Sequence, residues 1–76
     1  MKEQIKEILK RVLDVQDITD DISQQNCDVW DSLRHLNLIV ELESEFDISF
    51  EPEDIAAMKC IDDIILKIKE LSSSNN

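Results

Sequence analysis

Apolar residues recur at intervals of three and four positions in two segments, one near each end of the chain. The first segment contains Ile5, Ile8, Leu9, Val12 and Leu13. The second contains Ile61, Ile64, Ile65 and Ile68. Because this spacing places the apolar side chains on one face of a helix, it predicts amphipathic helices over residues 2–14 and from about residue 60 to residue 71.

Two further helices are expected in the middle of the chain. Asp31 or Ser32 can cap a helix that runs to about residue 46, and Pro52 suits the first turn of a short helix over residues 52–58. No segment of useful length alternates as a strand would, and there is no internal repeat. The predicted fold class is therefore all-α: a small four-helix bundle with three main helices and one short helix.

The segments outside these helices are polar. Residues 15–30 predict a loop that docks through Val15, Ile18 and Ile22. A calcium-binding loop beginning at Asp17 is excluded, because Ile22 falls where the sharp turn of such a loop requires glycine. We expect one domain over residues 1–71 and a disordered tail over residues 72–76.

The second predicted helix has more apolar surface than one core contact requires. One stripe, which suits the core, contains Leu38, Ile39, Leu42 and Phe46. A separate stripe is formed by Leu33, Leu36 and Val40. Either a neighbouring loop covers this second stripe or it stays exposed as a transient protein interface, and periodicity alone leaves both open.

Charge narrows the functional classes. The 76 residues include 18 Asp and Glu against 8 Lys and Arg, a net charge of −10, which disfavours nucleic acid and anionic membranes as partners. The surplus lies in residues 16–54, where twelve acids accompany Arg34 as the single basic residue. This region is either a solvated surface or a docking surface for basic partners. A chain of this length also leaves little room for a deep cleft with several catalytic groups.

Missing residue types exclude further classes. The sequence has no glycine, so it offers no glycine-rich phosphate loop. Cys27 and Cys60 stand far apart in sequence, which favours free thiols in a reducing cytoplasm over a single disulfide and offers no metal site. No apolar run is long enough for membrane insertion, and the first fifteen residues lack the apolar core of a signal peptide.

The tripeptide Asp31-Ser32-Leu33, which opens a helix ending in the segment 43–47 (Glu-Ser-Glu-Phe-Asp), resembles the acyl carrier protein family. The resemblance extends over nearly the whole chain in the order and spacing of the helices. It implies that Ser32 carries 4′-phosphopantetheine through a phosphodiester, attached by a phosphopantetheinyl transferase that reads Asp31 and Leu33. The terminal thiol of this group would hold an acyl or aminoacyl intermediate as a thioester, and the chain itself would not be an enzyme.

The same resemblance implies a partner-binding surface on the second helix. Leu36 and Val40 match apolar partner-facing positions. The acids expected to meet Lys and Arg of acyl-loading and acyl-processing enzymes with basic docking patches are Glu41, Glu43, Glu45 and Asp47. Such ion pairs at an interface rim mainly set association rate and orientation. We expect the carrier to act as a monomer.

Four residues depart from the pattern of fatty-acid carriers. Trp30 replaces a small residue, Arg34 and His35 stand where those carriers tend to be acidic or neutral, and Asn37 occupies a position that is commonly acidic there. The string Trp-Asp-Ser-Leu-Arg-His-Leu looks more like carriers that serve polyketide, peptide or other specialised acyl assembly than those of primary fatty-acid synthesis.

The sequence leaves open the role of His35 and two alternative functions. His35 lies one turn beyond Ser32 on the core side, either as a partly buried histidine with a satisfied nitrogen or as a hydrogen-bond partner of the phosphate or its arm. A Ser-His-Asp hydrolase is disfavoured because Asp31 adjoins Ser32 and there is no nucleophile elbow or separate oxyanion donor. The other rival is an unmodified acidic helical adaptor that binds a basic protein.

Overall fold

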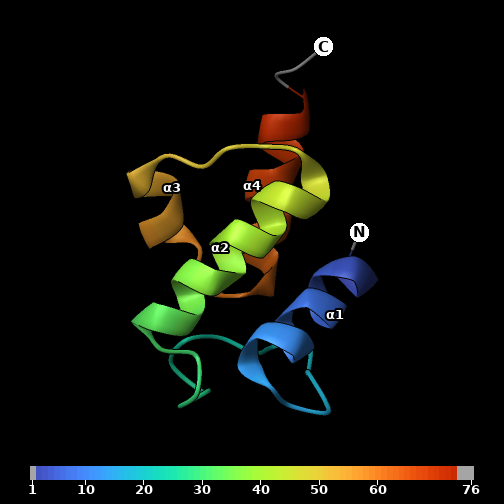
Figure 1. The fold of residues 1–76 in the computed structure, drawn as a ribbon, viewed down its shortest axis with the longest axis vertical. Coiled ribbons are helices and arrows are strands. Elements are labelled where there is room, and N and C mark those ends of the chain that lie inside the picture. The colour runs from blue at the N-terminus through green and yellow to red at the C-terminus, as the bar shows by residue number, and fades with distance from the viewer. Residues whose placement is uncertain (1, 74–76) are drawn as a thin grey trace.

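The structure, a computed structural model, describes residues 2–73. Four helices follow one another in this part of the chain: α1 (Lys2–Leu13), α2 (Ser32–Phe46), α3 (Pro52–Ala57) and α4 (Ile61–Ser73). Figure 1 shows α2 running diagonally across the front, with α1 and α3 on opposite sides of it and α4 behind. The predicted all-α fold with three main helices and one short helix is confirmed.

The ends of the helices differ slightly from those expected. α1 ends at Leu13 because Asp14 adopts a left-handed backbone with φ 57°, and Asp47 does the same after α2 with φ 53°. Glycine usually occupies this left-handed conformation, but Asp tolerates it better than most other residues. α4 continues through Ser73, so two residues of the expected tail are helical, and residues 74–76 lie outside the described residues.

The core forms where α1, α2 and α4 meet. Its fully buried side chains are Ile5, Leu9, Leu13, Leu38, Leu42, Met58, Ile61, Ile64 and Ile68. Three residues expected in the core stripes, Val12, Phe46 and Ile65, are only half-buried against this cluster. The helical spacing therefore predicted the core-facing side of these helices correctly, while residues at the edges of that side remain partly accessible.

The long loop between α1 and α2 is held from both sides. Ile18 and Ile22 are buried, as expected, while Val15 is half-buried. Asp20 pairs with Lys2 at 3.3 Å and with Lys6, and an isolated antiparallel bridge joins Ser23 to Cys60 just before α4. This loop thus closes one end of the bundle.

Several expectations concern absent features. Cys27 and Cys60 are free, half-buried thiols, so the single disulfide considered from the sequence does not form. Within residues 2–73, no group of three or more His, Cys, Asp or Glu is arranged to hold a metal ion. None of the helices described is both long and apolar enough to cross a bilayer.

Core packing predicts different effects for two neighbouring residues of α4. Ile64 is fully buried, whereas Leu66 is 63% exposed. Ile64→Ala leaves a cavity and should lower the free energy of unfolding by about 2–5 kcal/mol. Leu66→Ala should change it by less than about 0.5 kcal/mol. Urea unfolding followed by circular dichroism measures both, and equal effects would contradict this assignment of the core.

The loop ion pairs predict a specific pH dependence. The hydrogen bond from Lys6, reinforced by Lys2, lowers the pKa of Asp20 below its ordinary value of 3.8. A lowered folded pKa means that pairing stabilises the fold above the ordinary value and that this stabilisation is lost as pH falls through the folded pKa. The stability advantage of wild type over Asp20→Asn should therefore be present at neutral pH and disappear at strongly acidic pH.

Asp17→Asn is the matched control for this measurement. Asp17 is exposed and makes no hydrogen bond or ion pair with another described residue, and its replacement changes the net charge by the same amount. The unfolding free energy of Asp17→Asn should differ little from that of wild type at neutral pH and at strongly acidic pH. An Asp20→Asn variant that behaved like Asp17→Asn would show that the pairing does not stabilise the loop.

Candidate functional site

The first turn of α2 separates a capping residue from a free hydroxyl. Asp31 is the N-cap, and its Oδ1 accepts a hydrogen bond from the backbone N–H of Arg34 at 2.9 Å. Ser32 is the first helical residue, and it is exposed. Its hydroxyl makes no hydrogen bond with another described residue. Of the two capping candidates, the structure therefore uses Asp31 and leaves the Ser32 hydroxyl available for chemistry.

The electrostatics at this helix end suit an attached phosphate. Free N–H groups and the positive end of the helix dipole favour a negative charge there by about 0.3–1 kcal/mol. The first turn of α2 contains no acidic side chain, and the neighbouring Asp31 carboxylate is engaged by the Arg34 N–H. The site around Ser32 thus fits a phosphodiester without further basic residues.

Arg34 links the beginning of α2 to the end of α1. Its Nη1 donates a hydrogen bond to the Val12 carbonyl at 2.9 Å, which satisfies one of the carbonyls that the last turn of a helix leaves unpaired. One of the four departures from fatty-acid carriers therefore has a structural role. Sequence reasoning missed this contact because the two residues lie 22 positions apart.

His35 is buried, and both of its ring nitrogens are engaged inside the protein. The Trp30 indole N–H donates to Nδ1 at 3.1 Å, and Nε2 lies 2.8 Å from the Ile55 carbonyl oxygen of α3. An indole N–H only donates and a carbonyl only accepts, so Nδ1 is bare and Nε2 carries the proton. His35 is therefore a satisfied, neutral histidine, with neither nitrogen left for a phosphate or its arm.

The same contacts remove the basis for a hydrolase. His35 hydrogen-bonds with Trp30 and Ile55, and the Asp31 carboxylate caps the helix. No hydrogen bond joins either of them to the Ser32 hydroxyl in the described part of the chain. The arrangement therefore lacks the ordered nucleophile, base and acid of a catalytic triad.

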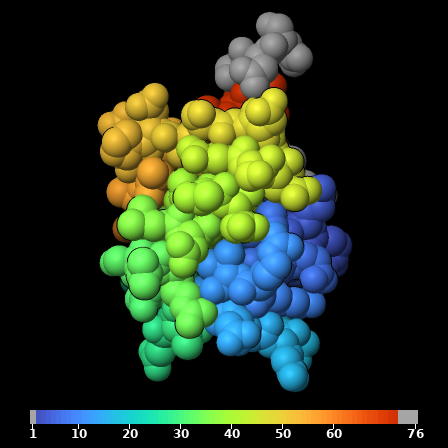
Figure 2. Space-filling view, in the orientation of Figure 1, coloured from blue at the N-terminus to red at the C-terminus, as the bar shows by residue number. Residues whose placement is uncertain are grey.

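The second apolar stripe of α2 is exposed. Leu33, Leu36 and Val40, here called the apolar face of α2, are 69%, 54% and 63% accessible. Figure 2 shows the outer surface of α2 crossing this side of the molecule between α1 and α3. The alternative in which a loop covers these residues is therefore wrong.

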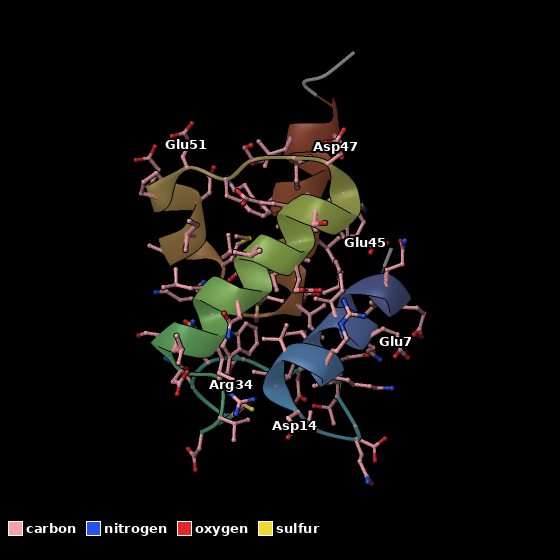
Figure 3. All side chains as sticks on the ribbon, in the orientation of Figure 1. Glu7, Asp14, Arg34, Glu45, Asp47 and Glu51 are labelled. Carbon is pink, nitrogen blue, oxygen red and sulfur yellow. The ribbon has the colours of Figure 1, made fainter. Side chains whose placement is uncertain are left out.

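The four acids expected to meet partners differ in their surroundings. Glu41 pairs with Arg11 at 2.6 Å, and the Glu43 Oε2 accepts the backbone N–H of Phe50 at 2.9 Å. Glu45 and Asp47 are exposed, and their carboxylates make no hydrogen bond or ion pair with other described residues. In Figure 3, Asp47 lies at the end of α2 opposite to Arg34. The acids left unengaged are thus those farthest from Ser32.

An open groove of about 420 Å³ borders the apolar face on the α1 side. It is lined by Arg11, Val12, Asn37, Val40 and Glu41. The Arg11–Glu41 ion pair lies on its rim. Sequence reasoning did not find this groove, because it depends on how α1 packs against α2.

Four helices with a free serine hydroxyl at the start of the second helix define a carrier-type domain. A family model described as "Phosphopantetheine attachment site" matches residues 3–68, so the chain belongs to that family. Members of the family carry a covalently attached 4′-phosphopantetheine, which confirms the cofactor expected from the sequence. Carrier domains of this kind are not themselves catalysts.

Two curated proteins are similar in sequence. An acyl carrier protein homolog of Mycoplasma genitalium is 42% identical over 41 residues, which are 54% of this chain and 49% of that protein. A D-alanyl carrier protein of Lactococcus lactis is 39% identical over 57 residues, 72% of each chain. The matched segment thus spans about half the length of the Mycoplasma protein.

Two solved structures share the fold over most of the chain. The NMR structure of a holo acyl carrier protein from Geobacter metallireducens has a TM-score of 0.85 and 29% identity, covering 97% of this chain and 87% of that one. A putative acyl carrier protein from Mycobacterium tuberculosis has a TM-score of 0.79 and 30% identity, covering 90% and 93%. The resemblance to acyl carrier proteins seen in the sequence is therefore confirmed.

The different roles of Asp31 and Ser32 predict different effects of alanine. Asp31→Ala removes the N-cap and should lower the free energy of unfolding by about 0.5–2 kcal/mol. Ser32→Ala removes a hydroxyl without an internal partner and should change it by less than about 0.5 kcal/mol. Both values come from urea unfolding of the unmodified protein. Equal destabilisation by the two variants would mean that Ser32 has a structural role.

Proposed function

We propose that this protein carries acyl or aminoacyl intermediates as thioesters on a 4′-phosphopantetheine group attached to Ser32. The observation that carries this proposal is the exposed hydroxyl of Ser32, unbonded at the start of α2 within a chain that belongs to the phosphopantetheine family. The group, once attached, supplies the thiol that forms the thioester. Two free, half-buried cysteines suit action in a reducing cytoplasm, and we expect a monomer.

The attachment needs only one atom of this chain. The Ser32 Oγ forms a bond to the phosphorus next to pantetheine in coenzyme A, the pyrophosphate P–O bond breaks, and adenosine 3′,5′-bisphosphate leaves. The hydroxyl proton passes to a base of the phosphopantetheinyl transferase. Asp31 keeps Ser32 at the helix terminus through its N-cap bond. Leu33, 69% exposed beside it, offers the transferase an apolar contact.

Partner enzymes would dock on the apolar face of α2. Leu36 and Val40 supply apolar contact, and Glu45 and Asp47 supply unengaged carboxylates for Lys and Arg of acyl-loading and acyl-processing enzymes. Glu41 becomes available only if a partner displaces Arg11, and Glu43 only if it releases the Phe50 amide. Exposed ion pairs of this kind contribute about 0–1 kcal/mol each, which suits a carrier that must leave each enzyme.

Specialised acyl or aminoacyl assembly fits the site better than primary fatty-acid synthesis. Arg34 and Asn37 leave the first half of α2 without an acidic side chain. Asn37 is exposed on the groove beside Val40, where a partner enzyme can contact its side chain. The similarity to a D-alanyl carrier protein also supports specialised acyl or aminoacyl assembly.

Modification by a broad-specificity phosphopantetheinyl transferase tests the attachment site. Intact mass after incubation with coenzyme A should increase by one phosphopantetheine in wild type and not at all in Ser32→Ala. Ser44→Ala is the matched control, because Ser44 is also exposed on α2 and its hydroxyl makes no hydrogen bond with another described residue; it should be modified like wild type. A reductant removes coenzyme A adducts of Cys27 or Cys60.

The same experiment decides between the carrier and an unmodified adaptor. An adaptor would use the apolar face and the acids of α2 without any covalent group. If correctly folded wild type gains no mass while a known carrier protein in a parallel reaction does, the carrier proposal is wrong and the adaptor remains.

A further inference from the structure

α3 is attached to the rest of the protein by few contacts. It has six residues and none of them is buried, and a helix this short is not stable alone. Ile55 packs half-buried against the core, and Asp54 pairs with Lys67 of α4 at 3.0 Å. Among the residues that the structure describes, the remaining side-chain hydrogen bond to α3 is that from His35 Nε2–H to the Ile55 carbonyl. His35 is therefore the polar contact that fixes α3 to α2.

The same imidazole also holds the segment that precedes α2. Trp30 is 3% exposed, and its indole N–H reaches the bare Nδ1 of His35 at 3.1 Å. Trp30 comes immediately before Asp31, the N-cap that sets Ser32 at the helix terminus. One side chain thus connects the last loop residue, α2 and α3 through two hydrogen bonds.

Ser32 lies beside this connection. Residues three apart in a helix are neighbours on the same side, so Ser32 and His35 share the side of α2 on which His35 meets α3. Figure 1 shows α3 alongside α2. Ser32 therefore lies next to the residue that joins the Trp30 segment to α3.

We propose that His35 is a positioning residue for the modification of Ser32. By holding Trp30 and the Ile55 carbonyl together, it presents the Ser32 hydroxyl to the transferase in one arrangement. It touches neither the hydroxyl nor coenzyme A. The inference rests on the proposed function, in which Ser32 is the attachment residue.

Positioning predicts a separation of the two kinetic constants. The apolar face and the acids of α2 remain in place when His35 changes, so the KM for the carrier should stay within about twofold of wild type. Misplacement of a reacting atom slows the chemical step, so kcat of a broad-specificity phosphopantetheinyl transferase should fall about tenfold in His35→Ala. Ile64→Val in the α4 core is the control for mere loss of stability, and it should keep both constants at temperatures where the protein is folded.

Substituting an amide for the imidazole of His35 tests its two hydrogen bonds one at a time. These variants also provide a test if His35→Ala does not fold. The amide oxygen of His35→Asn can replace Nδ1 as acceptor for Trp30, and the amide nitrogen of His35→Gln can replace Nε2 as donor to Ile55. Each should recover part of kcat. The emission of Trp30, the single tryptophan, should shift to longer wavelength in His35→Ala and return toward wild type in His35→Asn.

The outcomes distinguish this inference from the proposed function. Unchanged kcat in folded His35→Ala would overturn the positioning role, and so would a raised KM with unchanged kcat, because that result would make His35 part of the docking contact. A fall of kcat in all three His35 variants without partial recovery by Asn or Gln would also count against it. Failure of wild type to be modified would instead contradict the function proposed for Ser32.

Discussion

The hydrogen bond from the Arg34 amide to the Asp31 carboxylate decides where α2 begins, and the geometry of the site depends on that position. A helix turns by about 100° per residue, so burial of Leu38 and Leu42 in the core leaves Leu33 and Val40 on the outside. The Asp31 cap puts Ser32 at the first helical position of this packed helix.

Ion pairs within the protein occupy some of its carboxylates and leave others on α2 unengaged. Lys2 and Lys6 neutralise Asp20, Arg11 meets Glu41, and Lys67 meets Asp54. The described part of the chain offers no such partner to the carboxylates of Glu45 and Asp47. Figure 3 shows Asp47 and Glu51 at the end of the molecule opposite to Asp14 and Arg34. The resulting field costs some self-repulsion and favours encounter with basic surfaces.

The sequence predicted the elements and the apolar faces because both follow from local spacing. It did not predict contacts between residues far apart, such as Arg34 with Val12 or Arg11 with Glu41, since periodicity contains no information about which helix packs beside which. Helix ends were displaced for similar reasons: Met58, expected in the short helix, is instead buried after it. For His35 the local pattern left open a satisfied nitrogen or a bond to the phosphate or its arm, and the tertiary contacts with Trp30 and Ile55 decide for the first.

In the proposed function, α2 provides both the attachment residue and the docking surface on one helix. With a rise of 1.5 Å per residue, the thirteen positions from Ser32 to Glu45 place the free carboxylate about 20 Å from the hydroxyl. A partner that bound the far end of α2 would therefore be held at a set distance from the proposed attachment point, whichever group is carried. Because the core occupies only one side of this helix, a domain this small exposes the other side without losing the packing that keeps the helix in place.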